Sequence, residues 1–196
     1  MLPTLSTQRL QLVHMEPGHA RQLADFFSRN ERHLAPWDPP RPPGIMQTEF
    51  WVAEGERAVG EFEEGAVVRW LMFLRDDPQR VIGRVNITQI VRGPFHSCML
   101  GYAIDAAHEG LGLMGEALEA AIDHVFTVLR LHRIQANYVP NNERSGRLLQ
   151  RLGFEREGLA RDYLYIDGAW RDHILTARLN PAFDRSVFAA RPSRPA

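Results

Sequence analysis

Residues 108–118, HEGLGLMGEAL, place three glycines directly before an amphipathic pattern. Gly110, Gly112 and Gly115 allow positive φ values and let a ligand approach the backbone closely. The stretch follows a predicted strand and opens a predicted helix, a setting in which unpaired amides and the helix dipole favour an anion. We therefore predict an anion site formed by backbone amides, although Glu109 adds a carboxylate at its mouth.

The nucleotide-binding motifs with similar glycines do not fit this chain. GLGLMG formally matches G-x-G-x-x-G, but a dinucleotide fold has that turn after its first strand and an acidic residue about 20 residues further on, at a strand end. Here the turn follows the fourth predicted strand, and Asp123 falls in the middle of a helix. A Walker loop needs lysine, and all 23 basic residues of this chain are arginine.

The cysteine and the histidines predict neither a thiol nucleophile nor a metal site. Cys98 is the single cysteine and lies in an apolar run, CMLGYAI, which is typical of a small buried side chain. The histidines lack the His-x-x-x-His spacing of a metal site; those considered are His96, His108, His124, His132 and His173.

Hydrophobic periodicity predicts a mixed α/β domain. Strands are expected over 9–15, 66–76, 80–91, 98–105, 132–139 and, around the turn at 167–168, twice within 156–179. Helices are expected from Pro17 and over 45–64, 112–129 and 141–153, with Asn141 or Asn142 as a cap. Residues 33–44 form a proline-broken loop.

Length and composition fit one domain over residues 1–186 with a disordered tail over 187–196. The net charge of −1 gives no global attraction to nucleic acid or membranes. No apolar run approaches the ~20 residues of a membrane span, and the N-terminus lacks a signal-peptide layout. With a lone cysteine, the chain suits a reducing compartment, so we expect a cytoplasmic protein.

In its setting the glycine turn resembles the acyl-CoA loop of the GNAT N-acetyltransferases, whose pattern is Arg/Gln-x-x-Gly-x-Gly/Ala. The pattern falls on residues 109–114, with Glu109 in place of Arg or Gln and Met114 in place of a small residue. The resemblance implies that acetyl-CoA is the cosubstrate, that no metal is needed, and that Glu109 turns outward. The amides implied to hold the pyrophosphate are those of Gly110, Leu111, Gly112, Leu113, Met114 and Gly115.

A second block, residues 140–154 (PNNERSGRLLQRLGF), resembles the region of this family that flanks the CoA thiol arm. The resemblance implies that Asn142 and Ser145 contact the arm. It also implies that the strand LGYAI splays from its neighbour, so that its backbone pairs with the pantetheine through Tyr102, Ala103 and Ile104. The implied fold is one GNAT domain with a mixed, mostly antiparallel sheet of about seven strands and about four helices.

The implied reaction is attack of a neutral amine on a thioester, which needs a base for the amine and an acid for the thiolate. By resemblance Ser145 is the candidate acid, although helix-start hydrogen bonding would explain it equally well. Other catalytic positions of relatives are occupied here by Asn137, Leu149 and Leu164, so no general base is identified. Side chains that could instead hold a water are Tyr102, Tyr138, His96 and Asp162.

Arg144, Arg147 and Arg151 lie on one helical stripe. A solvated face explains such a stripe. The alternative is contact with the CoA 3′-phosphate, through Arg147 or Arg151.

A finer resemblance, to the RimJ-like ribosomal-protein-alanine N-acetyltransferases, rests on HLAPWDP, VRGPFHSCMLGYAI, NNERSGRLLQRLGFEREG and DYLYIDGAWRDHILTA. It implies acetylation of a protein N-terminal α-amine, on a ribosomal protein beginning with Ala or Ser, by a monomer or homodimer. The alternative acceptor is a small-molecule amine such as an amino acid, a polyamine or an antibiotic. The alternative of another class is a CoA-binding regulatory module without turnover.

Overall fold

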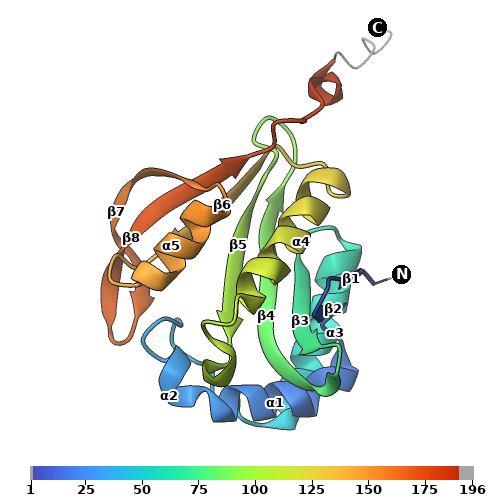
Figure 1. Cartoon of the computed structure of the whole chain (residues 1–196), viewed down its shortest axis with the longest axis vertical. Coiled ribbons are helices and arrows are strands. Elements are labelled where there is room, and N and C mark those ends of the chain that lie inside the picture. Colours follow the sequence, from blue (N-terminus) through green and yellow to red (C-terminus); the bar gives the residue numbers. More distant parts are fainter. Residues whose placement is uncertain (1, 190–196) are drawn as a thin grey trace, which may run out of the picture.

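The computed structural model describes residues 2–189. One eight-stranded sheet runs through the molecule in the order β1-β2-β3-β4-β5-β6-β8-β7 (Figure 1). The β5–β6 pair is parallel and the other neighbouring pairs are antiparallel. The strands are β1 (Thr4–Ser6), β2 (Leu10–His14), β3 (Val68–Leu74), β4 (Asp77–Val91), β5 (Ser97–Ile104), β6 (Arg133–Tyr138), β7 (Glu155–Ile166) and β8 (Ala169–Leu179).

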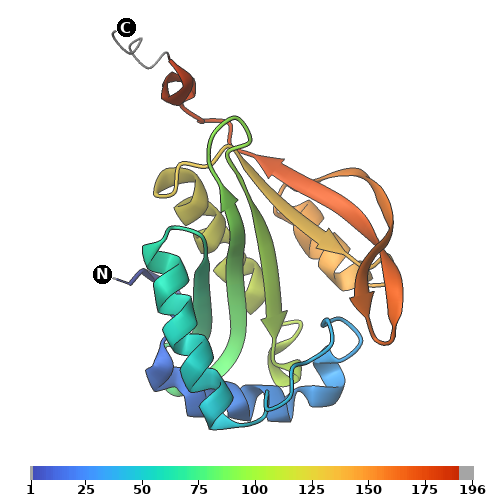
Figure 2. The ribbon, with the colours of Figure 1, turned by 180° about the vertical axis from the view of Figure 1, so that it is seen from behind.

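Helices cover both faces of this sheet. In Figure 1 α4 (Leu113–Thr127) and α5 (Glu143–Arg151) lie in front of the strands, and Figure 2 shows α3 (Thr48–Glu63) on the opposite face. Below them run α1 (Ala20–Arg29) and the single turn α2 (Glu31–Leu34). Short 3₁₀ turns are η1 (Pro17–His19), η2 (Ala106–His108) and η3 (Arg185–Phe188).

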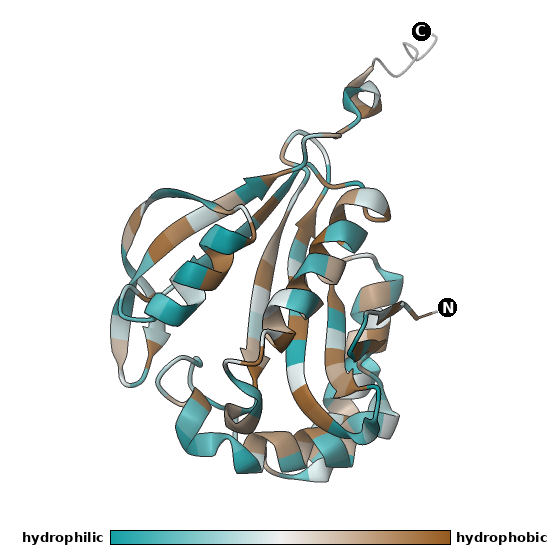
Figure 3. Cartoon of the chain, viewed as in Figure 1, coloured by the Kyte–Doolittle hydropathy of each residue, from teal (hydrophilic) through white to brown (hydrophobic). Residues whose placement is uncertain are grey.

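The sheet has a separate hydrophobic core on each face. Strand β3 shows why, because alternate side chains of a strand point to opposite faces. Trp70 and Met72 pack into the core under α4, whereas Leu71 and Phe73 pack into the core under α1 and α3. Helix α5 differs from α4: it is mostly hydrophilic in Figure 3, and Leu149 is its one buried residue.

The predicted elements are confirmed, with shifts at their ends. The structure adds the short edge strand β1 and the turn α2, which both lack the length needed for a periodic pattern. The tail expected over 187–196 begins inside η3, because Val187 and Phe188 belong to that turn, and residues 190–196 lie outside the described part. Within residues 2–189, no helix combines the length and apolar character needed to cross a membrane.

Candidate active site

The site lies where β5 and β6 separate. The two strands pair only over three positions, from Ser97 opposite Arg133 to Met99 opposite Gln135. Beyond Met99, β5 continues to Ile104 and keeps its pairing with β4 on the other side. The predicted splay is therefore present, and Tyr102, Ala103 and Ile104 lie on the free side of β5.

The glycine turn ends at the N-terminus of α4, as predicted. Gly110 and Gly112 both have a φ of 76°, in the left-handed region that favours glycine. The first amides of a helix have no acceptor within the helix, and the first amide bonded to the turn is that of Glu116, which donates to the Gly112 carbonyl at 3.2 Å. Among residues 2–189 the amides of the preceding three residues have no partner. These amides suit an anion.

Arg9 holds the outer side of the turn, and no local pattern in the sequence points to this residue. Its Nη1 donates to the Leu111 carbonyl at 2.9 Å, and its Nε donates to the Glu116 carboxylate at 2.7 Å. Thr7 donates a further hydrogen bond to Glu116. Burial acts to raise the pKa of Glu116, but the hydrogen bonds from Thr7 and Arg9 outweigh it and lower that pKa. The ionised carboxylate of Glu116, in the first turn of α4, is thereby balanced by the positive charge of Arg9.

The resemblance implies that Glu109 turns outward, but in the structure its side chain also has two partners. Its carboxylate pairs with the guanidinium of Arg144 from α5, and it lies 3.4 Å from His33 Nε2 of α2. The negative charge at the mouth of the turn is therefore balanced by a cation from an element 35 residues further along the chain. This pairing explains how an anion site can tolerate Glu109.

Two hydroxyls meet across the splay. The Tyr102 hydroxyl on β5 lies 2.7 Å from Ser145 Oγ on α5. Burial raises the pKa of Tyr102 to about 12, and the hydrogen bond with Ser145 opposes only part of that rise. Asn142 caps α5 by accepting from the Ser145 amide at 3.1 Å, as the capping prediction required. The Ser145 hydroxyl itself is therefore not used for helix capping.

Asp105 anchors the segment between β5 and the glycine turn. It is 3% exposed and accepts hydrogen bonds from the Ala107 amide at 3.0 Å and from Arg29 Nη2 at 3.1 Å. Arg80 Nη2 lies 3.3 Å from the same carboxylate. Burial acts to raise the pKa of Asp105, but these bonds lower it to about 2. A permanently charged carboxylate therefore joins α1, β4 and the base of the turn.

One cleft of about 820 Å³ runs from the glycine turn through the splay to the opposite face of the sheet. It is lined by every predicted cofactor-binding residue except Leu111, which is 56% exposed and lies outside. Its arginines are Arg84, Arg144, Arg147 and Arg151, and its carboxylates are Asp38 and Glu109. The arginines outnumber the carboxylates, so the cleft suits a polyanionic ligand.

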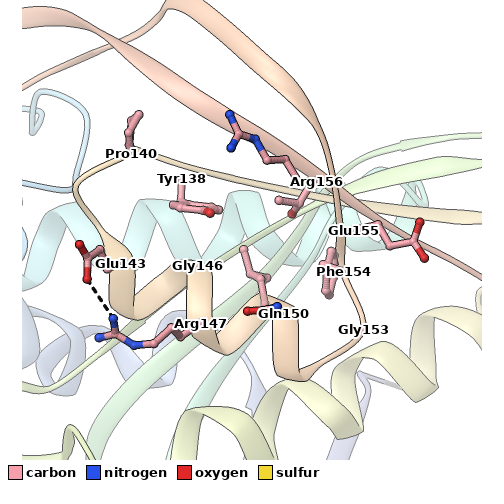
Figure 4. A pocket seen from close by; sticks show the side chains of 12 residues that line it. Tyr138, Pro140, Glu143, Gly146, Arg147, Gln150, Gly153, Phe154, Glu155 and Arg156 are labelled. Carbon is pink, nitrogen blue, oxygen red and sulfur yellow. Dashed lines mark hydrogen bonds and ion pairs between the residues drawn. The ribbon is translucent and has the colours of Figure 1, made fainter.

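A second cavity, of about 760 Å³, lies on the other side of α5 (Figure 4). The Glu143–Arg147 ion pair, at 3.0 Å, borders it, and Tyr138 and Arg147 line both cavities. The Tyr138 ring lies directly against Gly146, where a Cβ would come within 2.7 Å of the phenol oxygen. Tyr138 therefore has a packing role.

Two of the proposed water-holding side chains are not in the cleft. His96 packs against Phe183 and Phe188 near the C-terminus, with ring centroids 5.4 and 5.2 Å away. Asp162 is exposed on β7 and is absent from the cleft wall. Cys98 is buried, and burial raises the pKa of its thiol to about 12, so it does not act as a nucleophile. Over residues 2–189 no three His, Cys, Asp or Glu side chains group as metal ligands.

Splayed strands beside a glycine-led helix N-terminus define an acyl-CoA site of the acetyltransferase type. The domain family described as Acetyltransferase (GNAT) domain matches residues 9–155, and the chain belongs to this family. It is an N-acetyltransferase with acetyl-CoA as its acetyl donor.

The chain is similar along most of its length to enzymes that modify ribosomal proteins. It is 44% identical over 177 residues to the [Ribosomal protein uS5]-alanine N-acetyltransferase of Escherichia coli, covering 90% of this chain and 91% of that one. A ribosomal-protein-S5-alanine acetyltransferase from Vibrio fischeri superimposes with a TM-score of 0.89 at 35% identity, over 93% and 99% of the chains. RimJ of Mycobacterium smegmatis, solved in complex with a CoA-disulfide, superimposes with a TM-score of 0.82 at 29% identity, over 87% of this chain and 81% of that one.

Proposed function

We propose that this enzyme acetylates the N-terminal α-amine of a ribosomal protein that begins with alanine or serine. The observation that carries the proposal is the similarity to the uS5-alanine enzyme along nearly the whole chain. An α-amine has a pKa of about 8, against about 10.4 for a lysine side chain. A weak base is therefore sufficient to give a neutral nucleophile near neutral pH.

The cleft supports a chain terminus as the acceptor. On the face away from α4, its walls come from the loop that carries Trp37 and from the β7–β8 hairpin that carries Leu164. Trp37 is 36% exposed and Leu164 is 41% exposed, so both offer apolar surface to a bound peptide. A peptide end can enter between these two walls while the rest of the acceptor stays outside.

A polyamine acceptor is less well supported. A polycation needs uncompensated carboxylates, but both carboxylates of the cleft are paired with arginines. Asp38 lies 3.2 Å from Arg84 and 3.6 Å from Arg41, and Glu109 pairs with Arg144.

The geometry supports a set of contacts with acetyl-CoA. The amides between Gly110 and Gly115 would hold the pyrophosphate, and the free edge of β5 at Tyr102, Ala103 and Ile104 would pair with the pantetheine amides. Asn142, which caps α5, would lie beside the same arm. Arg147 or Arg151 would contact the 3′-phosphate. Ser145, hydrogen-bonded to Tyr102, would donate to the departing thiolate.

The test is acetyl transfer to matched peptides, measured as the gain in mass of each peptide. Peptides with a free N-terminal Ala or Ser and an internal lysine should gain one acetyl group, and the same peptides with a blocked N-terminus should gain none. Acetylation of amino acids, polyamines or antibiotics without peptide acetylation would contradict the proposed acceptor. A CoA-binding module without turnover predicts no thiol release with any amine. Action in the cytoplasm, by a monomer or homodimer without nucleic acid or membrane, stays a prediction.

A further inference from the structure

His173 lies on β8 in a position suited to chemistry. It is 3% exposed, yet it contributes to the wall of the cleft. Thr176 of the same strand lines the cavity beside α5. His173 is three positions earlier on β8, and alternate side chains of a strand point to opposite faces, so His173 points away from α5. Leu164 and Trp37 line the cleft on that face. This is the face on which the acceptor is proposed to enter.

The hydrogen bonding of His173 fixes its tautomer. Its Nδ1 lies 3.0 Å from the backbone carbonyl oxygen of Arg171. A carbonyl oxygen only accepts, so Nδ1 must carry the hydrogen and Nε2 of the neutral ring must carry the lone pair. Within the described chain, Nε2 has no hydrogen-bond partner. The ring therefore presents an unused basic nitrogen in a buried position beside the cleft.

The neighbours of His173 hold the ring without competing for Nε2. The Tyr163 ring of β7 packs on it with centroids 5.1 Å apart. Tyr163 accepts a hydrogen bond from Asn137 Nδ2 at 3.0 Å, and Asn137 Oδ1 accepts from the Thr176 amide at 3.3 Å. Both ends of the Asn137 amide are thus used to hold strands together.

His173 lies on the same face of the sheet as Asn137, whose side-chain amide is already hydrogen-bonded at both ends. In this chain Asn137 pairs with Leu175 of β8, and Leu175 and His173 share one face. Of these side chains on one face, the imidazole is the one that keeps an acceptor nitrogen without a partner within residues 2–189. The ionisable groups on its side are Tyr163, whose ring contacts it, Arg171 on the same face of β8, and Asp38 and Arg84, which line the same cleft.

We infer that His173 is the general base that takes a proton from the acceptor ammonium group through Nε2, directly or through one water. The inference rests on acetyl transfer to an amine but not on which amine is used. The neutral amine then forms the C–N bond with the acetyl carbon, and the C–S bond breaks. The attacking nitrogen loses its second proton through water to the Ser145 hydroxyl as that hydroxyl protonates the thiolate. His173 returns its own proton to solvent.

The experiment compares His173→Asn with His132→Gln. Asparagine can keep the hydrogen bond to the Arg171 carbonyl through Nδ2 but has no basic nitrogen. His132 packs on Phe183 outside the cleft and serves as the matched control. At pH 7, kcat of His173→Asn should fall about 100-fold, while CoA affinity and melting temperature stay close to those of the control. The deficit should shrink as the pH approaches 9.5, because the amine then loses its proton unaided.

An equal loss of kcat at every pH, or no loss, would overturn the inference. If the variant unfolds, the wild-type enzyme still tests the inference. Its kcat/KM is then measured against pH with acceptors whose amines differ in pKa. An acidic limb of kcat/KM that stays fixed across acceptors, beside a basic limb that moves with the pKa of the amine, supports His173. A profile set only by the amine contradicts it. Both experiments run with peptide or small-amine acceptors, so a wrong acceptor and a wrong base give different results.

Discussion

Replacing Asp105 with asparagine should destabilise the enzyme and weaken CoA binding. Asparagine keeps the size of the side chain and can still accept from the Ala107 amide, but it removes the charge that pairs with Arg29 and Arg80. A pKa lowered from 3.8 to about 2 corresponds to about 2 kcal/mol, at ~1.36 kcal/mol per pH unit. For a chain of this size that predicts a melting temperature lower by roughly 4–8 °C.

The pH dependence provides a sharper test of the same charge. The pKa of Asp105 is lower in the folded protein than in the unfolded chain, so its contribution is full above pH 3.8. It should be lost as the pH falls from 3.8 towards 2. Wild type and Asp105→Asn should therefore differ in free energy of unfolding at pH 7 and converge in acid.

Denaturant unfolding at several pH values measures this difference, and isothermal titration measures CoA affinity. Asp123→Asn, an exposed position on α4, is the matched control and should change stability little. A difference below about 0.5 kcal/mol at pH 7, the size of an ordinary surface change, would refute the reasoning that this ion cluster anchors the turn.

Further predictions concern the turn, the hydroxyl pair and a buried histidine. Gly112→Val should abolish measurable CoA binding in a titration, because a β-branched residue does not adopt a φ of 76°; binding at wild-type strength would show that another conformation suffices. Ser145→Ala should lower turnover with CoA affinity nearly unchanged, and unchanged turnover would remove its catalytic role. Glu109→Gln should tighten CoA binding about fivefold, from ~1 kcal/mol of relieved repulsion, because Arg144 then faces the phosphates unpaired; equal or weaker binding would argue against this. His14 is 1% exposed with both ring nitrogens lacking partners within the described chain, and burial lowers its pKa below 6.5. Wild type should therefore lose stability as the pH falls below 6.5, and His14→Phe should unfold at higher denaturant concentration and lack this loss; an unchanged acid transition would contradict the assignment.

Local signals in the sequence were sufficient for the elements and for the anion site. The periodicity of each helix and strand depends on residues a few positions apart, and the glycines before α4 define their own backbone geometry. For the same reason the cap at Asn142 was predictable, since it joins residues three positions apart. An element that is too short to carry a period, such as β1 or α2, has no such local signal.

Contacts between distant residues were not predictable. Nothing near Glu109 indicates that Arg144 balances it, and nothing near the turn indicates that Arg9 holds it from 102 residues away. Residue type alone groups His96 and Asp162 with Tyr102, but the fold places both outside the cleft. In the sequence His173 is a candidate only as a metal ligand, because spacing along the chain says nothing about the free nitrogen of a ring.

Sequence alone is enough to predict the order of elements, the amide-lined turn and the family resemblance, since each follows from short-range spacing and residue type. The tertiary structure decided which charges neutralise one another, which hydroxyls meet and which histidine reaches the acceptor face. The physical reason is that a polar side chain takes its chemistry from the partner at hydrogen-bond distance. In this chain those partners come from strands and helices that only folding brings together.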